Sequence, residues 1–132
     1  MLFKYEVESN KRECLIDITK YLYDAIKKAK VKNGMAIIYC PHTTAAITIN
    51  ENADPSVRED IIKFLSYLIP KDFNYKHLEG NSDAHIKSSL VGCSEVIIIE
   101  DGKPILGTWQ SLFFAEFDGP RRRKVYIKII EG

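Results

Sequence analysis

The chain has 132 residues, of which 45% are hydrophobic and 28% charged, and its formal net charge at pH 7 is +1. This length and balance predict one soluble globular domain, residues 1–132, that is large enough to bury a hydrophobic core. The near-neutral charge gives no general reason to expect binding to nucleic acid or to an anionic membrane, and no apolar run reaches the length of a membrane span.

The three cysteines, Cys14, Cys40 and Cys93, have unrelated spacings and form no CxxC motif. A disulfide framework is therefore not expected, and a reducing cytoplasm fits the chain better. Cys40 lies two residues before His42 and could be a thiol nucleophile. It also ends the apolar run 35–39, so we favour a buried thiol in the core.

The first half of the chain alternates strand and helix patterns. Residues 3–8 alternate between apolar and charged side chains, which predicts a half-buried strand, and residues 15–18 predict a second one. Thr19 is expected to cap a helix, and Asn33-Gly34 to end it with a left-handed glycine. Residues 35–39 predict a central strand.

A polar break at residues 41–44 precedes a second alternating run, residues 45–50. If that strand begins near His42, alternation divides its side chains between an apolar core face and a polar, site-like face. The core face would carry Ala45, Ile47 and Ile49, and the polar face His42, Thr44, Thr48 and Asn50.

Two further helices are predicted in the middle of the chain. Asp54-Pro55 is typical of a helix start, and Pro70 of a helix end. The apolar residues between them predict a buried stripe: Val57, Ile61, Phe64, Leu65 and Leu68. Ser82 or Asp83 is expected to cap a short helix that ends at Gly92 and carries His85 in its first turn.

The last third of the chain is strand-like. Residues 96–100 lead to Asp101-Gly102, a hairpin signal, and residues 112–117 and 124–129 predict two more strands. Strands outnumber helices and hairpin connections favour antiparallel pairing. We therefore expect an α+β fold with mostly antiparallel, sandwich-like sheets and two to three helices.

All three histidines, His42, His77 and His85, lie in polar, turn-rich segments. Imidazole can bind a metal when neutral and can carry a proton near neutral pH, and three histidines plus water form an open catalytic zinc set. The spacings match no local metal motif, so the sequence does not show that the three meet. The alternative is three separate surface or hydrogen-bonded histidines.

Other polar segments supply further candidates. Glu51 could be a general base or orient a histidine, or lie in a solvated loop. Asn81 and Lys87 near His85 suggest an anion site at a helix N-terminus. The alternative is that the polar residues here simply cap an exposed helix. Arg121–Arg123 suits phosphate binding, but these arginines could also form a solvated turn or pair with acidic neighbours such as Glu116 or Asp118. A lone tryptophan, Trp109, is more often a core or interface residue.

Several of these segments together resemble the YjbQ-like family, often labelled secondary thiamine-phosphate synthase. The resemblance rests on residues 41–55, 74–77, 84–89 and 107–110, followed by Glu116 and 121–123. It implies a small α+β protein with antiparallel sheets, assembled as a homotrimer, with a polar pocket carrying His42, His77 and His85. The family label implies joining a hydroxymethylpyrimidine diphosphate to a thiazole phosphate with release of pyrophosphate, as a weak or secondary activity.

We therefore expect a small cytoplasmic enzyme that acts on a phosphorylated small molecule, with a divalent metal bound by His42, His77 and His85. Zinc is favoured, and magnesium would suit a diphosphate substrate. The expected catalytic residues are His42, Glu51 and His85. The expected substrate-binding residues are Thr43, Thr44, Asn50, Asn81, Lys87, Trp109, Gln110, Arg121 and Arg123. The alternative is a non-catalytic trimer that binds a metal or a metabolite. Nucleic-acid binding through one basic turn is disfavoured.

Overall fold

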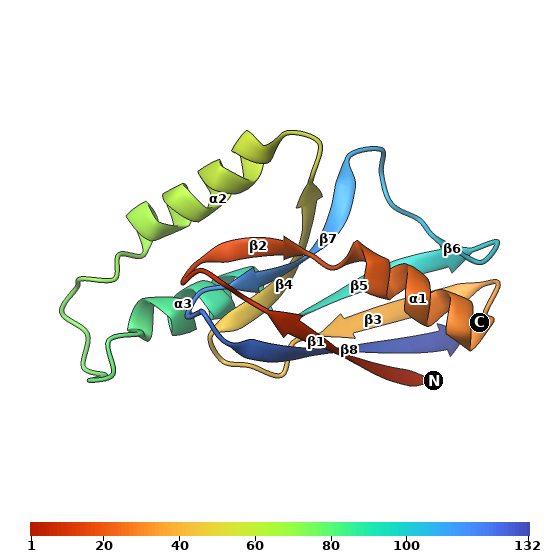
Figure 1. Ribbon diagram of the computed structural model, residues 1–132, viewed down its shortest axis with the longest axis horizontal. Helices are drawn as coiled ribbons and strands as arrows, with labels where there is room; N and C mark the ends of the chain where they lie inside the picture. Colours follow the sequence, from red (N-terminus) through yellow and green to blue (C-terminus); the bar gives the residue numbers. More distant parts are fainter.

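Two antiparallel sheets form the body of the molecule in the computed structural model, which describes residues 1–132 (Figure 1). The larger sheet has the strand order β1 (Leu2–Glu8), β8 (Arg122–Glu131), β3 (Gly34–Tyr39), β5 (Ser94–Glu100) and β6 (Lys103–Pro104). The smaller sheet has the order β2 (Cys14–Asp17), β7 (Gln110–Glu116) and β4 (Ala45–Glu51). With α1 (Thr19–Ala29), α2 (Pro55–Leu68) and α3 (Ser82–Val91), these strands confirm the predicted α+β class.

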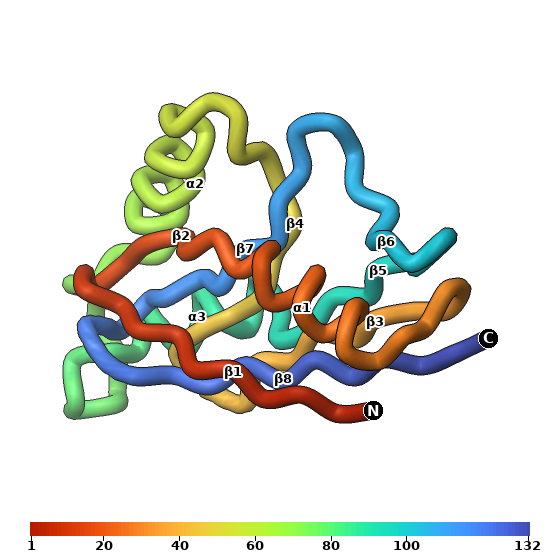
Figure 2. The backbone as a smooth tube through the Cα atoms, turned by 45° about the vertical axis from the view of Figure 1, so that its right-hand side comes forward, coloured from red at the N-terminus to blue at the C-terminus, as the bar shows by residue number.

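The main core lies between the inner face of the larger sheet and a layer made of the smaller sheet and α1 (Figures 1 and 2). Strand β8 follows the predicted alternation, because Val125, Ile127 and Ile129 are buried while Lys124 and Lys128 are exposed. A second, smaller apolar cluster lies on the far face of the smaller sheet, where α2 and α3 contact it.

The predicted start of α2 is confirmed, since the Asp54 carboxylate accepts a hydrogen bond of 2.9 Å from the Ser56 amide. The other two helix starts differ from the prediction. Thr19 is the first residue of α1 and Ile18 takes the cap position, and Asn81 precedes α3 without a capping side-chain bond.

The predicted end of α1 is wrong by several residues. The helix ends at Ala29, and the residue that caps it, Lys30, is the left-handed one, with φ of 56°. Gly34 instead begins β3, where a Cβ would lie 2.0 Å from the Ile130 carbonyl oxygen of β8. Close approach of two strands, not a helix cap, therefore requires this glycine.

The predicted stripe of α2 is not buried in the protomer. No residue of this helix is buried, and Phe64 and Leu68 are 60% and 55% exposed. Helical periodicity placed these side chains on one face, but α2 contacts the smaller sheet along only part of that face. The apolar remainder is open to solvent or to another molecule.

Candidate functional site

A polar pocket of about 380 Å³ lies where several strand and helix ends meet. Its walls come from the β3–β4 connection, the loop and first turns of α3, and the turn between β7 and β8. None of its lining residues is hydrophobic, and they are Pro41, His42, Thr43, Thr44, Glu79, Asn81, His85, Asp118, Arg121 and Arg123. Segments far apart in the sequence thus bring together seven of the predicted site residues. Glu79 and Asp118 also line the pocket and were not predicted to do so, although both are acidic neighbours of the predicted site segments.

His42 is the most firmly held histidine of this pocket. Its Nε2 accepts a hydrogen bond of 2.9 Å from the Lys124 amide of β8, and its ring meets that of Phe114 edge to face. Burial and the nearby Arg123 guanidinium lower the pKa of His42 below its ordinary value. The imidazole is therefore neutral at pH 7.

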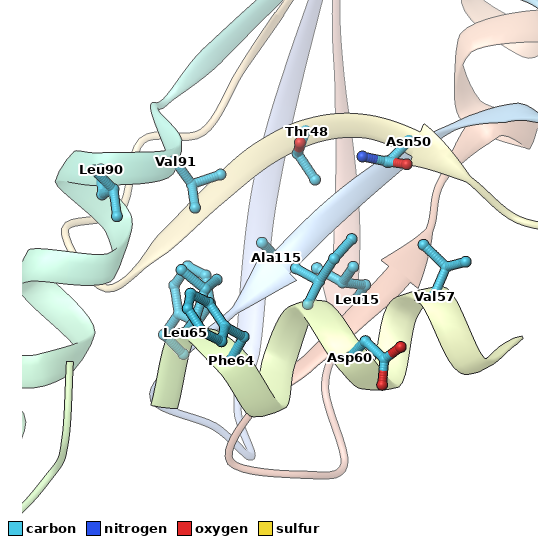
Figure 3. A pocket seen from close by; sticks show the side chains of 12 residues that line it. Leu15, Thr48, Asn50, Val57, Asp60, Phe64, Leu65, Leu90, Val91 and Ala115 are labelled. Atoms are coloured by element: carbon cyan, nitrogen blue, oxygen red, sulfur yellow. The ribbon is translucent and has the colours of Figure 1, made fainter. Parts of the chain in front are cut away.

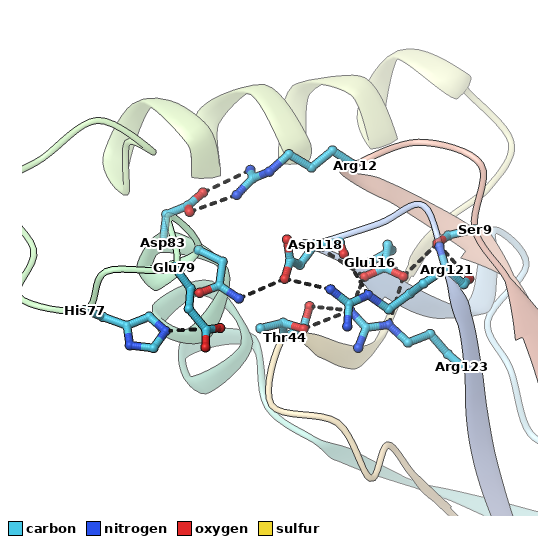
Figure 4. Close-up of polar contacts among 11 residues, drawn as sticks. Ser9, Arg12, Thr44, His77, Glu79, Asp83, Glu116, Asp118, Arg121 and Arg123 are labelled. Carbon is cyan, nitrogen blue, oxygen red and sulfur yellow. Dashed lines mark hydrogen bonds and ion pairs between the residues drawn. The ribbon is translucent and has the colours of Figure 1, made fainter.

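Arg123, which lines the pocket, forms a buried ion pair with Glu116, which does not (Figure 4). Arg123 also donates to Thr44 Oγ1 at 2.8 Å, while Glu116 accepts from Ser9 Oγ at 2.7 Å. Burial disfavours the charged carboxylate, but hydrogen bonds from Arg123, Ser9 and the Asp118 amide outweigh this, so the pKa of Glu116 is lowered. No hydrogen bond within the protein uses Arg123 Nη1.

Asp118 joins the two sides of the pocket. Its carboxylate accepts 2.9 Å hydrogen bonds from Asn81 Nδ2 and from Arg121 Nη2. Each pocket arginine is therefore paired with a carboxylate. Pairing with Glu116 or Asp118 was one of the alternatives that the sequence left open. The Asn81 side-chain oxygen is buried and has no partner.

His77 lies beside His85 rather than in the main pocket. The two ring centroids are 5.6 Å apart, both rings line an adjoining shallow pocket, and His77 Nε2 is 3.7 Å from Glu79 Oε2. No group of three His, Cys, Asp or Glu side chains lies close enough together in the protomer to hold a metal ion. The donor set of a single chain thus does not fit the three-histidine zinc site in this arrangement.

Lys87 does not reach the pocket. Its side chain is 1% exposed, and its ammonium pairs with Glu13 and with Asp83 at 3.2 Å and donates to Ser66. Arg12 completes this cluster with a two-pronged contact to Asp83 (Figure 4). A direct contact between Lys87 and a phosphate in the histidine pocket is inconsistent with this burial.

The remaining predicted residues form a separate group at the other end of β4. Asn50, Glu51, Trp109 and Gln110 line one surface pocket there, and Trp109 is 64% exposed. Because β4 has seven residues, each rising about 3.3 Å, roughly 20 Å separates the two groups within a protomer.

The expected polar face of β4 is also corrected by the structure. The strand begins at Ala45, after a turn, so His42 is not in its register. Thr48 and Asn50 face a mostly apolar groove between α2 and α3 instead of the histidine pocket (Figure 3).

Cys40 is a core residue, as favoured from the sequence. It is 1% exposed, and burial raises the pKa of its thiol to about 11. A thiolate nucleophile is not available at neutral pH from such a group.

This fold and pocket define a small α+β protein with a polar, histidine- and arginine-lined site between the ends of two antiparallel sheets. The family model described as "UPF0047 protein YjbQ-like" matches residues 3–132, and the chain belongs to this family. UPF0047 protein MJ1081 of Methanocaldococcus jannaschii is 73% identical over 98% of this chain and 94% of its own length. YugU of Bacillus subtilis is 47% identical over 98% and 99%.

Solved structures of the family have the same fold. A YjbQ/UPF0047 protein of Clostridium acetobutylicum superposes with a TM-score of 0.96 at 55% identity, covering 97% of this chain and 99% of that one. A protein of unknown function from Sulfolobus solfataricus has a TM-score of 0.96 at 30% identity, covering 100% and 97%. No helix of the chain is both long and apolar enough to cross a membrane.

Proposed function

We propose that the pocket around His42 and His85 binds a small phosphorylated molecule, and that the protein is a small enzyme acting on it. The main support is the pocket's composition. Two arginines, two histidines, two threonines and an asparagine converge there, and no hydrophobic residue lines the pocket. Such a lining suits a strongly hydrated ligand that is recognised by directed hydrogen bonds.

The charges of the pocket suit an anion that is bound by directed hydrogen bonds and not by a large net positive charge. Arg121 and Arg123 are each paired with a carboxylate, so the net charge of the pocket is small. Guanidinium N–H groups that remain free can still donate to phosphate oxygens, and charge-assisted bonds of this kind are stronger than neutral ones.

Two histidines in the same pocket supply groups that can move or donate protons. His42 is neutral and fixed, and His85 projects from the first turns of α3. The reaction to be tested first is the one suggested by the family resemblance, the joining of a pyrimidine diphosphate to a thiazole phosphate. Binding without turnover would favour the alternative, a metabolite-binding protein.

The binding proposal is tested by calorimetric titration with inorganic phosphate, pyrophosphate and a panel of phosphorylated metabolites. Arg121→Met should weaken binding by about tenfold or more, which corresponds to about 1.4 kcal/mol. Arg122→Met is the matched control, because Arg122 is exposed on the same segment and lies outside the pocket. Equal affinity in the wild type and in Arg121→Met would contradict the phosphate assignment.

A metal-dependent form of this function is the second candidate. It is favoured by the adjacent rings of His77 and His85, which are the residues best placed to share an ion. A third ligand must come from a side-chain movement or from another subunit, because the protomer offers no complete set. Metal analysis of the purified protein and zinc titration of His85→Ala test this form: a metal-free wild type with no zinc affinity would contradict it.

We also propose that the working unit is a homotrimer, as the family resemblance implies. Its support in the structure is the apolar surface left exposed on α2 and on the outer face of β5. Burial of such surface against copies of the same chain is a common reason for symmetric assembly.

A further inference from the structure

His42 is fixed by a backbone amide, and this contact determines which of its nitrogens is free. The Lys124 N–H of β8 donates to His42 Nε2 at 2.9 Å, and the edge-to-face contact with Phe114 fixes the plane of the ring. No hydrogen bond within the protein uses Nδ1. The imidazole therefore has one nitrogen held by the backbone and one without a protein partner, in a residue that lines the pocket.

The chemistry of imidazole then fixes the tautomer. A neutral imidazole has one nitrogen that carries a proton and one that offers a lone pair, and the protonated form offers no lone pair at all. Because Nε2 accepts the Lys124 N–H, it must hold the lone pair, and Nδ1 must carry the proton. A metal ligand needs a lone pair, so His42 cannot hold a metal ion and keep this hydrogen bond.

We propose that His42 is a fixed N–H donor, which binds an anionic oxygen of the ligand through Nδ1 and is not a metal ligand. The identity of the ligand as a phosphate rests on the function proposed above, but the tautomer does not. Arg123, which lines the same pocket and has Nη1 without a protein partner, is placed to donate to the same anion. The three histidines are thereby divided into one donor, His42, and one pair, His77 and His85.

The tautomer is tested directly by long-range proton–nitrogen correlation spectra of the ¹⁵N-labelled protein near pH 7. Only three histidines contribute, and spectra of His77→Gln and His85→Gln assign the third set of signals to His42. We expect the His42 ring to be protonated at Nδ1 and unprotonated at Nε2. A ring protonated at Nε2, or at both nitrogens, would overturn the proposal.

The role is tested by titrating variants with pyrophosphate and, separately, with zinc. His42→Ala should weaken pyrophosphate binding at least about tenfold and leave zinc affinity within about twofold of the wild type. His42→Asn should bind pyrophosphate nearly as well as the wild type, because its amide N–H lies close to the position of Nδ1. A loss of zinc affinity in His42→Ala as large as that in His85→Ala would refute the donor role.

Failure of the proposed function remains distinguishable from failure of this inference. If the wild type binds neither pyrophosphate nor any phosphorylated metabolite but His42 is protonated at Nδ1, the phosphate function fails and the donor assignment stands. If pyrophosphate binds and His42 is protonated at Nε2, the function stands and the donor assignment fails.

Discussion

At the scale of single residues, the ion pair of Glu116 and Arg123 both stabilises the fold and shapes the pocket. Both side chains are almost fully buried, at 0% and 3% exposure; Ser9 donates a further hydrogen bond to Glu116, and Thr44 accepts one from Arg123. A buried pair is costly to desolvate, but removal of one partner is more costly because it leaves an uncompensated charge. The pair therefore makes folding dependent on the ionised state of Glu116.

We expect Glu116→Gln to lower the free energy of unfolding at pH 7 by about 3–5 kcal/mol. The double variant Glu116→Gln/Arg123→Met should recover part of this loss, because no unpaired charge is then left behind. Urea unfolding followed by circular dichroism measures both. A single variant as stable as the wild type would show that the pair contributes little.

The same pair predicts a pH dependence with a defined sign. The pKa of Glu116 is lower in the folded state than in the unfolded state, so its stabilising contribution is present above the unfolded value, about 4.3, and is lost as the pH falls through the lower folded value. Between pH 4.5 and pH 2 the wild type should therefore lose more stability than Glu116→Gln. Parallel acid-induced losses in the two proteins would contradict this.

At the scale of secondary-structure elements, α3 has two functions on opposite faces. One face presents His85 to the pocket, and the other buries Lys87 and Asp83 against Arg12, Glu13 and Ser66. The sequence suggested that Lys87 belongs to an anion site near the N-terminus of this helix, and a cation in a first helical turn would oppose the helix dipole. The compensating negative charges are present, but they are carboxylates of the protein rather than a ligand.

Lys87→Met should consequently affect stability and not ligand binding. Loss of the ammonium leaves Asp83 and Glu13 with Arg12 alone, and we expect a fall of about 3 kcal/mol in the free energy of unfolding. Lys63→Met on α2 is the control, since Lys63 is exposed and has no ion-pair partner. A loss of pyrophosphate affinity of about tenfold in folded Lys87→Met would show that this lysine contributes to ligand binding after all.

At the scale of the whole molecule, sequence patterns identified most helices and strands but did not determine the distances between segments. Alternation correctly placed Val125, Ile127 and Ile129 in the core, and the Asp54 cap correctly began α2. The histidines could be identified as candidates because each lies in a polar break. Whether they meet depends on sheet pairing and on loop paths, which one sequence does not determine.

The predicted site residues lie in two separate pockets for the same reason. Asn50 and Glu51 follow His42 closely in sequence, but an extended strand carries them to the far end of the sheet, beside Trp109 and Gln110. Periodicity also cannot tell whether an apolar face is covered by the same chain, and this is why the stripe of α2 was wrongly predicted to be buried.

The protomer exposes more surface than a compact monomer of its mass, which supports the proposed trimer. Its accessible area is 8027 Å², whereas a compact monomer of 15.1 kDa should expose about 7,100 Å². Part of the excess is apolar. The groove beside α2 has a volume of about 490 Å³ (Figure 3). Val96 and Ile98 of β5 are 58% and 60% exposed. Strand β7 is also apolar on both faces, but its residues Leu112, Phe113 and Phe114 are fully buried within the protomer, so it offers no such surface.

Light scattering at micromolar concentration should therefore give three times the mass of the 15.1 kDa chain. Phe64→Lys on α2 and Ile98→Lys on β5 introduce charge at positions that are 60% exposed in the protomer, so neither should disturb the folded chain itself. A charge that is buried at a subunit interface is costly, and at least one variant should lower the measured mass while its circular dichroism spectrum stays native. Lys63→Glu serves as the control for a change of charge on α2. A wild type of monomeric mass would rule out the trimer, and two variants of unchanged trimeric mass would show that other surfaces form the interface.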